Sequence, residues 1–168
     1  MLSGFVRFRS TQYACLLVAA LSIGACARNP ADQTAGAMGA NASAATPGSQ
    51  QDFVVNVGDR VWFQVDSSEL THQSIATLEK QAQWLRAYPQ YQFMIEGHAD
   101  ERGTREYNLA LGARRSAAAR DYLISRGIAA NRMRTISYGK ERPVAVCDDI
   151  SCWSQNRRAV TVLDGAAS

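Results

Sequence analysis

The chain has 168 residues, 46% of them hydrophobic and 20% charged, with a formal net charge of +3 at pH 7. This length suits one globular domain with an extension. Two of its cationic residues, Arg7 and Arg9, lie in an N-terminal segment that we expect to be removed. This segment contains no acidic residue, so its removal lowers the formal charge from +3 to +1. A nearly neutral mature chain lacks the basic surface that attracts nucleic acid, so we expect no nucleic-acid partner.

Residues 1–25 have the features of an export signal. A positive start is followed by the apolar run from Tyr13 to Ile23, which is too short to span a bilayer comfortably. The small residues Gly24 and Ala25 then precede Cys26, as in a lipobox. We therefore predict cleavage before Cys26 and lipidation of its thiol. The alternative is an ordinary secretory signal that is cut at small residues, with Cys26 incidental.

The segment after Cys26 has a different composition. Residues 27–51 are rich in Ala, Gly, Ser, Asn and Thr and contain almost no large apolar residue. Such a segment cannot bury enough apolar surface to offset the entropy cost of ordering it. We predict a flexible tether over residues 26–51, with a fully extended reach of roughly 80 Å. The folded domain is then expected over residues 52–168.

Hydrophobic periodicity in this domain predicts four strands and two long helices. The expected elements are a strand over 61–66, a helix over 71–87, a strand around 93–97, a helix over 104–126, a strand over 133–138 and a strand over 158–163. Thr104 is a candidate N-cap of the second helix, and Gly127 is its expected left-handed C-terminal residue. Alternation of strands and helices implies some parallel pairing. We predict an α/β (α+β) two-layer sandwich, in which two main helices cover one face of a mixed four-stranded sheet.

Cys147 and Cys152 form the one remaining cysteine pair of the exported chain. An oxidising compartment allows them to form a disulfide, and the short loop gives a stabilisation of about 2 kcal/mol. We expect removal of this bond to leave ligand binding largely intact. A metal or redox pair is the alternative, but the C-x4-C spacing has no second pair and both histidines lie far off in the sequence. We therefore expect no metal and no cofactor.

Residues 95–115, IEGHADERGTREYNLALGARR, carry the clearest functional signal. A strand leads into an acid-rich loop with Asp100 at its start, and a helix follows. On that helix Asn108, Leu111 and Arg115 are spaced i, i+3, i+7 and share one face. A carboxylate on the loop and a guanidinium two turns along the helix can together bind a ligand that has both an ammonium and a carboxylate.

This segment resembles the peptidoglycan-binding motif of OmpA-like domains. GHADERGTREYN, LGARR, SYGKERP and NRRAV follow one another between about Val61 and Val162, and their order resembles the peptidoglycan-associated lipoproteins of Gram-negative envelopes. The resemblance implies an outer-membrane lipoprotein that faces the periplasm and binds the meso-diaminopimelate of peptidoglycan stem peptides. It also implies a partner, TolB of the Tol system, on an overlapping surface, and a role in cell division. Ala27, after the lipidated cysteine, is not aspartate, which by the enteric sorting rule favours the outer membrane.

The resemblance also implies roles for particular residues. The family's ligand-binding aspartate matches Asp100 and its arginine matches Arg115. The ammonium of diaminopimelate needs an acceptor, and its carboxylate suits a guanidinium fork. An internal salt bridge or a helix cap is the alternative, and we expect both groups to be at least partly exposed. Arg114 lies about 100° around the helix and is expected to be solvated.

Six further candidates come from the helix face, the end of the first strand and the loop: Asn108, Leu111, Asp66, Phe63, Arg102 and Thr104. Asn108 could instead be a structural hydrogen bonder and Leu111 a core residue. The first strand departs from the common family form, because Gln64 stands where an acid often precedes the last aspartate. Arg102 and Thr104 lie where backbone N–H groups at a helix start could meet a carboxylate.

A second function class is an exported hydrolase that modifies the wall. His98 and Asp100 could suggest a metal or hydrolytic site, but the sequence shows no nucleophile motif and no third ligand, so we predict that the chain is not an enzyme. An OmpA-like motility stator is disfavoured, because no membrane-spanning segment is evident apart from the signal. The motif Asn156-Arg157-Arg158 could either order the last strand or contact the ligand.

Overall fold

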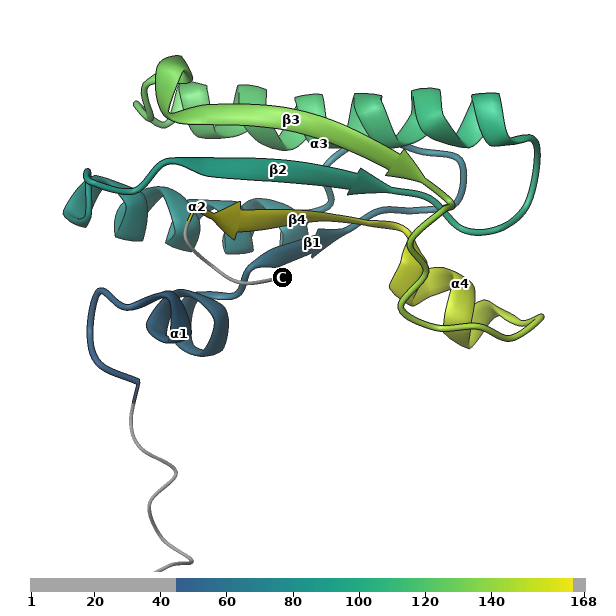
Figure 1. The fold of residues 1–168 in the computed structure, drawn as a ribbon, viewed down its shortest axis with the longest axis horizontal. Coiled ribbons are helices and arrows are strands. Elements are labelled where there is room, and N and C mark those ends of the chain that lie inside the picture. Colours follow the sequence, from purple (N-terminus) through teal and green to yellow (C-terminus); the bar gives the residue numbers. More distant parts are fainter. Residues whose placement is uncertain (1–44, 165–168) are drawn as a thin grey trace, which may run out of the picture. The chain divides into compact units, whose positions relative to one another are not determined.

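The computed structural model describes residues 45–164 (Figure 1). The predicted signal peptide, Cys26 and residues 27–44 of the predicted tether lie outside the described residues. The elements in chain order are α1 (Gln50–Asp52), η2 (Phe53–Val57), β1 (Arg60–Trp62), α2 (His72–Ala87), β2 (Phe93–His98), α3 (Arg105–Ser125), η3 (Ala130–Arg132), β3 (Met133–Gly139), α4 (Ile150–Asn156) and β4 (Arg158–Leu163). Within residues 45–164 no helix combines the length and apolar character needed to cross a membrane.

The four strands form one mixed sheet in the order β1-β4-β2-β3. β2 and β3 are parallel, whereas β4 runs antiparallel to both β1 and β2. A parallel pair needs a crossover connection, and α3 supplies it. Figure 1 shows α2 and α3 on the same face of the sheet. The predicted two-layer sandwich with a mixed four-stranded sheet is confirmed.

Both long helices begin and end where the sequence predicts. The Thr71 side chain accepts a hydrogen bond from the Ser74 N–H at 3.1 Å, and Thr104 accepts one from the Tyr107 N–H at 3.2 Å. These side chains satisfy N–H groups that a helix start leaves free. Gly127 follows α3 with a φ of 86°, the left-handed conformation expected of a residue that ends a helix.

The first strand is shorter than predicted. β1 ends at Trp62, whose partner is Arg158, the first residue of β4. Beyond this pair the strand has no residue of β4 to bond, and the chain turns at Asp66, which has a φ of 54°. Val65 is consequently 49% exposed rather than buried in the sheet. The predicted strand over 61–66 was therefore wrong in its second half.

The hydrophobic core lies between the sheet and the two long helices. Its most buried members are Phe53, Val61, Leu78, Ala82, Leu85, Phe93, Ile95, Ala119, Leu123, Ile128 and Ala159. Leu78, Ala82 and Leu85 come from the predicted apolar face of α2. Burial of an aliphatic or aromatic side chain of this size stabilises a fold by about 1.5–3 kcal/mol each, so this face of α2 fixes the helix on the sheet.

Two glycines let α3 lie unusually close to β2. A Cβ atom on Gly97 would stand 1.8 Å from the carbonyl oxygen of Gly112. Only glycine at position 97 permits this distance between strand and helix. The close approach places the face of α3 that carries Asn108, Leu111 and Arg115 directly beside the end of β2.

The packed part of the chain begins a few residues before the predicted boundary at 52. The Tyr91 hydroxyl donates to the Gly48 carbonyl at 2.8 Å, and the Trp84 indole N–H donates to Asp52 at 2.8 Å. Ser49 caps α1. Gly48, assigned to the tether by its composition, thus lies against Tyr88 and Tyr91 of the domain. α1 lies at the end of the sheet opposite to the end where β2 finishes (Figure 1).

Candidate functional site

A pocket of about 220 Å³ opens where β2 ends and α3 begins. Its lining residues are Val65, Asp66, Asp100, Arg102, Gly103, Tyr107, Asn108, Leu111 and Arg115. Six of the eight predicted ligand-binding residues are among them, and the two exceptions are Phe63 and Thr104. The turn after β1, the loop after β2 and the first half of α3 therefore meet in one place, although they are distant in sequence.

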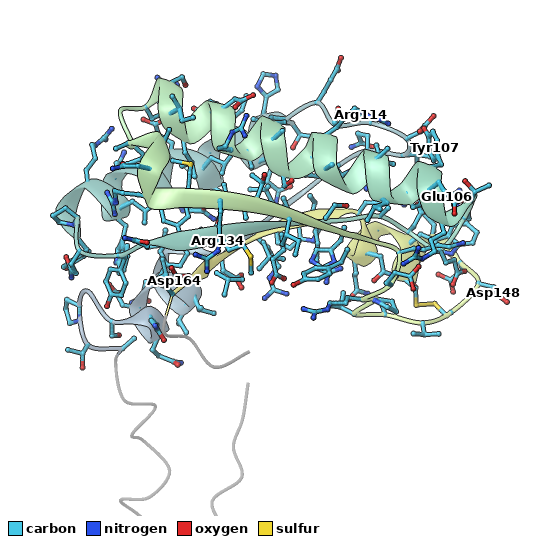
Figure 2. The ribbon with its side chains drawn as sticks, turned by 45° about the horizontal axis from the view of Figure 1, so that its top comes forward. Glu106, Tyr107, Arg114, Arg134, Asp148 and Asp164 are labelled. Atoms are coloured by element: carbon cyan, nitrogen blue, oxygen red, sulfur yellow. A yellow bond between two sulfur atoms is a disulfide. The ribbon has the colours of Figure 1, made fainter. Side chains whose placement is uncertain are left out.

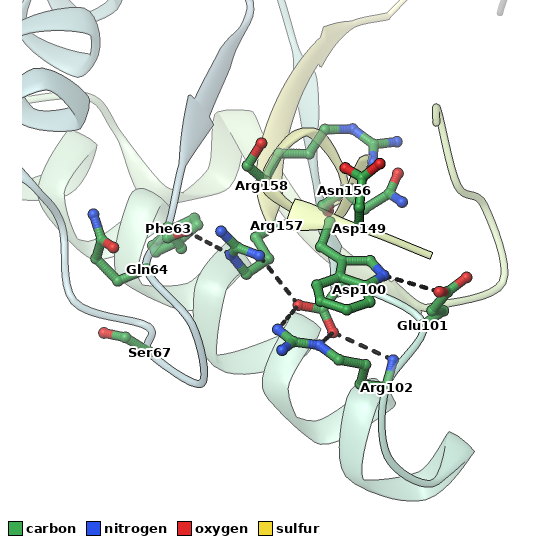
Figure 3. Close-up of polar contacts among 12 residues, drawn as sticks. Phe63, Gln64, Ser67, Asp100, Glu101, Arg102, Asp149, Asn156, Arg157 and Arg158 are labelled. Atoms are coloured by element: carbon green, nitrogen blue, oxygen red, sulfur yellow. Dashed lines mark hydrogen bonds and ion pairs between the residues drawn. The ribbon is translucent and has the colours of Figure 1, made fainter. Parts of the chain in front are cut away.

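Asp100 lies at the buried side of this pocket and is 7% exposed. Its carboxylate accepts hydrogen bonds from Arg102 Nη2 at 2.7 Å and Nε at 3.2 Å, and from Arg157 Nη1 at 3.3 Å (Figure 3). The backbone N–H of Arg102 adds a fourth donor at 3.3 Å. Burial acts to raise the pKa of the Asp100 carboxyl, but Arg102 and Arg157 outweigh it and hold the pKa below its usual value. Because two carboxylate oxygens offer about four acceptor positions, the arginines occupy most of them.

Asp66 faces the same pocket with far more of its carboxylate available. It lies at the turn after β1, is exposed, and accepts a hydrogen bond from the Tyr107 hydroxyl. That bond raises the pKa of the Tyr107 hydroxyl, which therefore remains a donor at neutral pH. Asp66 can thus accept further hydrogen bonds from a cationic ligand group.

Arg115 is fully buried at the base of the pocket, with 0% exposure. Its guanidinium donates to three backbone carbonyl groups: Nε to Ser67 at 2.8 Å, Nη1 to His98 at 2.8 Å and Nη2 to Gln64 at 3.1 Å. The expectation that Arg115 is partly exposed was therefore wrong, because carbonyls of the turn after β1 and of the last residue of β2 converge on it. Three of its five N–H groups are used in this way, which leaves two on the same guanidinium. Burial lowers the pKa of Arg115 to about 10, against the charge of Asp100, so the group stays cationic at neutral pH.

Asn108 and Leu111 have both of the roles that the sequence left open. Asn108 is 2% exposed, lines the pocket, and donates to the carbonyls of Arg102 at 2.7 Å and Thr104 at 3.1 Å. It therefore holds the loop after β2 in its conformation. Leu111 is 5% exposed and forms an apolar part of the pocket wall.

Phe63 and Thr104 support the pocket without lining it. The Phe63 ring is buried, and its centroid lies 5.2 Å from the guanidinium carbon of Arg115. Phe63 also lines a neighbouring pocket of about 260 Å³ together with Arg157. Thr104 uses its hydroxyl to cap α3. Their direct contact with a ligand stays a prediction.

Tyr107, Val65 and Gly103 line the pocket but were not singled out from the sequence. Tyr107 stands four residues before Leu111 and eight before Arg115, so the same helical spacing that identified those residues could have found it. Figure 2 shows Tyr107 near the start of α3, with Arg114 further along the same helix. Arg114 is exposed, as predicted, and does not line the pocket.

The Asn156-Arg157-Arg158 motif divides between structural roles and the site. The Asn156 side chain accepts from the Val144 N–H at 2.8 Å and donates to the Ala145 carbonyl at 2.7 Å. Arg158 donates to the Arg142 carbonyl at 3.2 Å. Asn156 and Arg158 thus order the segment before β4, whereas Arg157 contacts Asp100 inside the site.

His98, which could have suggested catalysis, is buried at the end of β2. Its Nε2 lies 3.5 Å from a Glu96 carboxylate oxygen, and neither ring nitrogen has a hydrogen-bond partner within residues 45–164. Burial, together with the positive charge of Arg158, lowers the pKa of His98 to about 3, so the ring is neutral at physiological pH. Among the described residues, no group of three or more His, Cys, Asp or Glu side chains is arranged to hold a metal ion.

The fold and the site together define the class of protein. Residues 62–157 match the OmpA family, and the chain belongs to this family. The family match begins at the last residue of β1 and covers the two long helices, the loop with Asp100 and Arg157 of the site.

The chain is also similar to peptidoglycan-associated lipoproteins. It is 68% identical over 154 residues to the one from Rhizobium meliloti (strain 1021), which covers 90% of this chain and 87% of that protein. It is 41% identical over 120 residues to the one from Pseudomonas aeruginosa, which covers 71% of each chain. These relatives are named as lipoproteins and not as enzymes, which agrees with the prediction that this chain is not an enzyme.

Solved structures give the same result for the fold. The crystal structure of the peptidoglycan-associated lipoprotein from Burkholderia pseudomallei has a TM-score of 0.64 and 40% sequence identity, and it covers 68% of this chain and 98% of that one. The C-terminal domain of Helicobacter pylori MotB has a TM-score of 0.60 at 22% identity, covering 65% of this chain and 86% of that domain. At this identity the second likeness concerns the fold alone.

Proposed function

We propose that the chain is an outer-membrane lipoprotein that binds peptidoglycan non-covalently and so ties the membrane to the wall. Membership of the OmpA family and similarity to peptidoglycan-associated lipoproteins support this reading. The pocket is the observation that carries it, because carboxylates and guanidinium groups face one space of about 220 Å³. A zwitterionic ligand end fits this combination of charges.

The ligand end that we propose is the free ammonium and carboxylate of meso-diaminopimelate. Asp66 has acceptor capacity for the ammonium, whereas Asp100 is largely occupied by Arg102 and Arg157. Asp100 therefore contributes its negative charge and holds the two arginines. The carboxylate is bound by the unused N–H groups of the partly exposed Arg102, since a guanidinium matches a carboxylate in a two-pronged geometry, and the buried Arg115 adds its positive charge from beneath the pocket.

Titration of the purified full-length protein with synthetic stem peptides tests this function. A peptide with lysine in place of diaminopimelate keeps the ammonium but lacks the carboxylate, and we expect its affinity to fall by at least about tenfold, or roughly 1.4 kcal/mol. Asp66→Asn removes the negative charge of the proposed ammonium acceptor and should weaken binding of the diaminopimelate peptide. Arg114→Leu, on an exposed position of the same helix, is the control and should bind normally. Equal affinity for the two peptides would show that the carboxylate is not recognised.

Purified sacculi separate binding from hydrolysis. The protein should pellet with sacculi and release no muropeptide fragments. Soluble fragments in the supernatant would instead identify a wall-modifying enzyme.

We also propose that Cys26 carries the lipid anchor and that TolB of the Tol system binds on or near the pocket, with a role in cell division. The lipobox-like sequence before Cys26 and the resemblance in the four motifs support these proposals. Mass spectrometry of the mature protein should find a lipidated N-terminal cysteine, and Cys26→Ser should release a soluble form that still binds the wall. The diaminopimelate peptide should compete with purified TolB, and simultaneous binding of both would contradict a shared surface.

A further inference from the structure

Arg102 is the exposed arginine of the pocket, and its side chain is held from two sides. Its Nε and Nη2 atoms bond Asp100 at 3.2 and 2.7 Å, an arrangement that leaves Nη1 unused and directed away from Asp100. Its guanidinium carbon lies 4.3 Å from the centroid of the Trp153 ring. The indole N–H of Trp153 in turn donates to the Glu101 carboxylate at 2.8 Å. Trp153 thus contacts both residues that follow Asp100 on the loop.

The backbone of this loop does not depend on Trp153. Asn108 bonds the carbonyl of Arg102, and the Lys140 ammonium donates to the carbonyls of Glu101 at 3.1 Å and Gly103 at 2.7 Å. What Trp153 adds is a flat surface for the Arg102 guanidinium, whose side chain is 42% exposed. A partly exposed arginine otherwise samples many rotamers, so this contact selects one of them.

The position of Trp153 depends on the neighbouring disulfide. Trp153 follows Cys152 directly in α4, a helix of seven residues, which is too short to be stable by itself. The bond from Cys152 to Cys147 ties the first turn of α4 to the preceding loop, with the Cα atoms 5.7 Å apart. The other end of α4 is held by Asn156 through the backbone of Val144 and Ala145. The disulfide is therefore a covalent attachment of the first turn of α4, one residue before Trp153.

We propose that the Cys147–Cys152 disulfide positions Trp153, and that Trp153 is a positioning residue that holds the Arg102 guanidinium ready for the carboxylate of the ligand. Ligand affinity then depends on a covalent bond that does not touch the ligand. This inference rests on the proposed function of the pocket, and it replaces the expectation that removal of the disulfide leaves ligand binding intact.

The expected change in ligand affinity follows from the entropy cost of ordering the Arg102 side chain. Immobilising one long side chain on binding costs about 0.5–1.5 kcal/mol, so losing the pre-positioned Arg102 should raise Kd by roughly 2- to 12-fold. The Cys147→Ser/Cys152→Ser variant and the Trp153→Leu variant should each show this increase. Combining them should add little, because both remove the same restraint. Trp153→Phe keeps a ring face for Arg102 and should retain most of the affinity.

Two measurements on the purified full-length protein test the proposal. The first is the Kd for the diaminopimelate stem peptide, with Val146→Ser as the matched control, since Val146 is in the same loop and 80% exposed. The second is the NMR resonance of the Arg102 Nε–H group, which the ring current of Trp153 shifts. This resonance should lose the ring-current shift in the disulfide-free and Trp153→Leu variants, and should stay close to its wild-type position in Trp153→Phe and Val146→Ser.

The outcomes separate the two proposals. An unchanged Arg102 resonance and unchanged Kd in the disulfide-free and Trp153→Leu variants would overturn the positioning role while leaving the proposed function intact. Failure of the wild-type protein to bind the peptide would refute the proposed function. In that case the resonance still decides whether the disulfide positions Arg102.

Discussion

Arg115→Leu should destabilise the domain as well as disrupt the pocket. The substitution removes the donor from three backbone carbonyls, those of Gln64, Ser67 and His98. The bond to His98 is fully buried, and the other two are partly buried. A buried polar group left without a partner costs about 1–3 kcal/mol, and the partly exposed carbonyls recover water. Removal of a buried charge recovers part of this cost, so the net decrease in the unfolding free energy is about 3 kcal/mol. This is a large part of a typical stability of roughly 5–15 kcal/mol.

Urea unfolding followed by circular dichroism measures this loss directly. Arg114→Leu is the matched control, because it makes the same chemical change one residue away on an exposed position and should alter stability by at most about 0.5 kcal/mol. If the two variants unfold at the same urea concentration, Arg115 does not hold the loops in the way described. Binding of Arg115→Leu must be measured well below its unfolding transition, since loss of wall binding alone would not distinguish ligand contact from unfolding.

Three further predictions concern stability. His98 has a pKa of about 3 in the fold against 6.5 for the ordinary side chain, so between these pH values the unfolded chain binds the extra proton and the unfolding free energy falls as the pH drops from 6.5 towards 3. His98→Phe should remove most of this pH dependence between pH 6.5 and 5, measured by urea unfolding at each pH. An unchanged pH dependence would mean that other groups cause it. Cys147→Ser/Cys152→Ser should lower the unfolding free energy by about 2 kcal/mol, and identical urea midpoints would contradict this. Gly97→Ala places a methyl group against the Gly112 carbonyl and should lower the unfolding free energy by about 3 kcal/mol or more, which a large drop in Tm would show. A Tm equal to that of the wild type would mean that α3 can move away from β2 freely.

The elements that the sequence predicts best are those whose ends are encoded locally. α3 has a capping threonine at Thr104 and a glycine at position 127, and both of its predicted ends agree with the structure. β1 was predicted too long because the alternation of apolar residues continues after Trp62, whereas its pairing stops there. That limit is set by Arg158 of β4, which is almost a hundred residues away.

The site shows the same division between local and distant information. The shared face of Asn108, Leu111 and Arg115 follows from helical spacing, and all three line the pocket. The burial of Arg115 could not be predicted, because its acceptors include backbone carbonyls 48 and 51 residues away and a carbonyl carries no side-chain signature. The contact between Trp153 and Arg102 likewise joins two segments whose proximity no periodicity encodes.

The docked segment at Gly48 has a mechanical consequence. The chain enters the domain beside α1, at the end of the sheet opposite to the end where β2 finishes (Figure 1). The pocket is lined by residues of the loop that follows β2. With the chain before residue 45 attached to a membrane and the pocket attached to the wall, as proposed, tension would run along β1 rather than across it. The hydrogen bonds between β1 and β4 would then be sheared together instead of opened one after another. Arg115, which bonds the turn after β1, would pass this tension from the strand to the pocket.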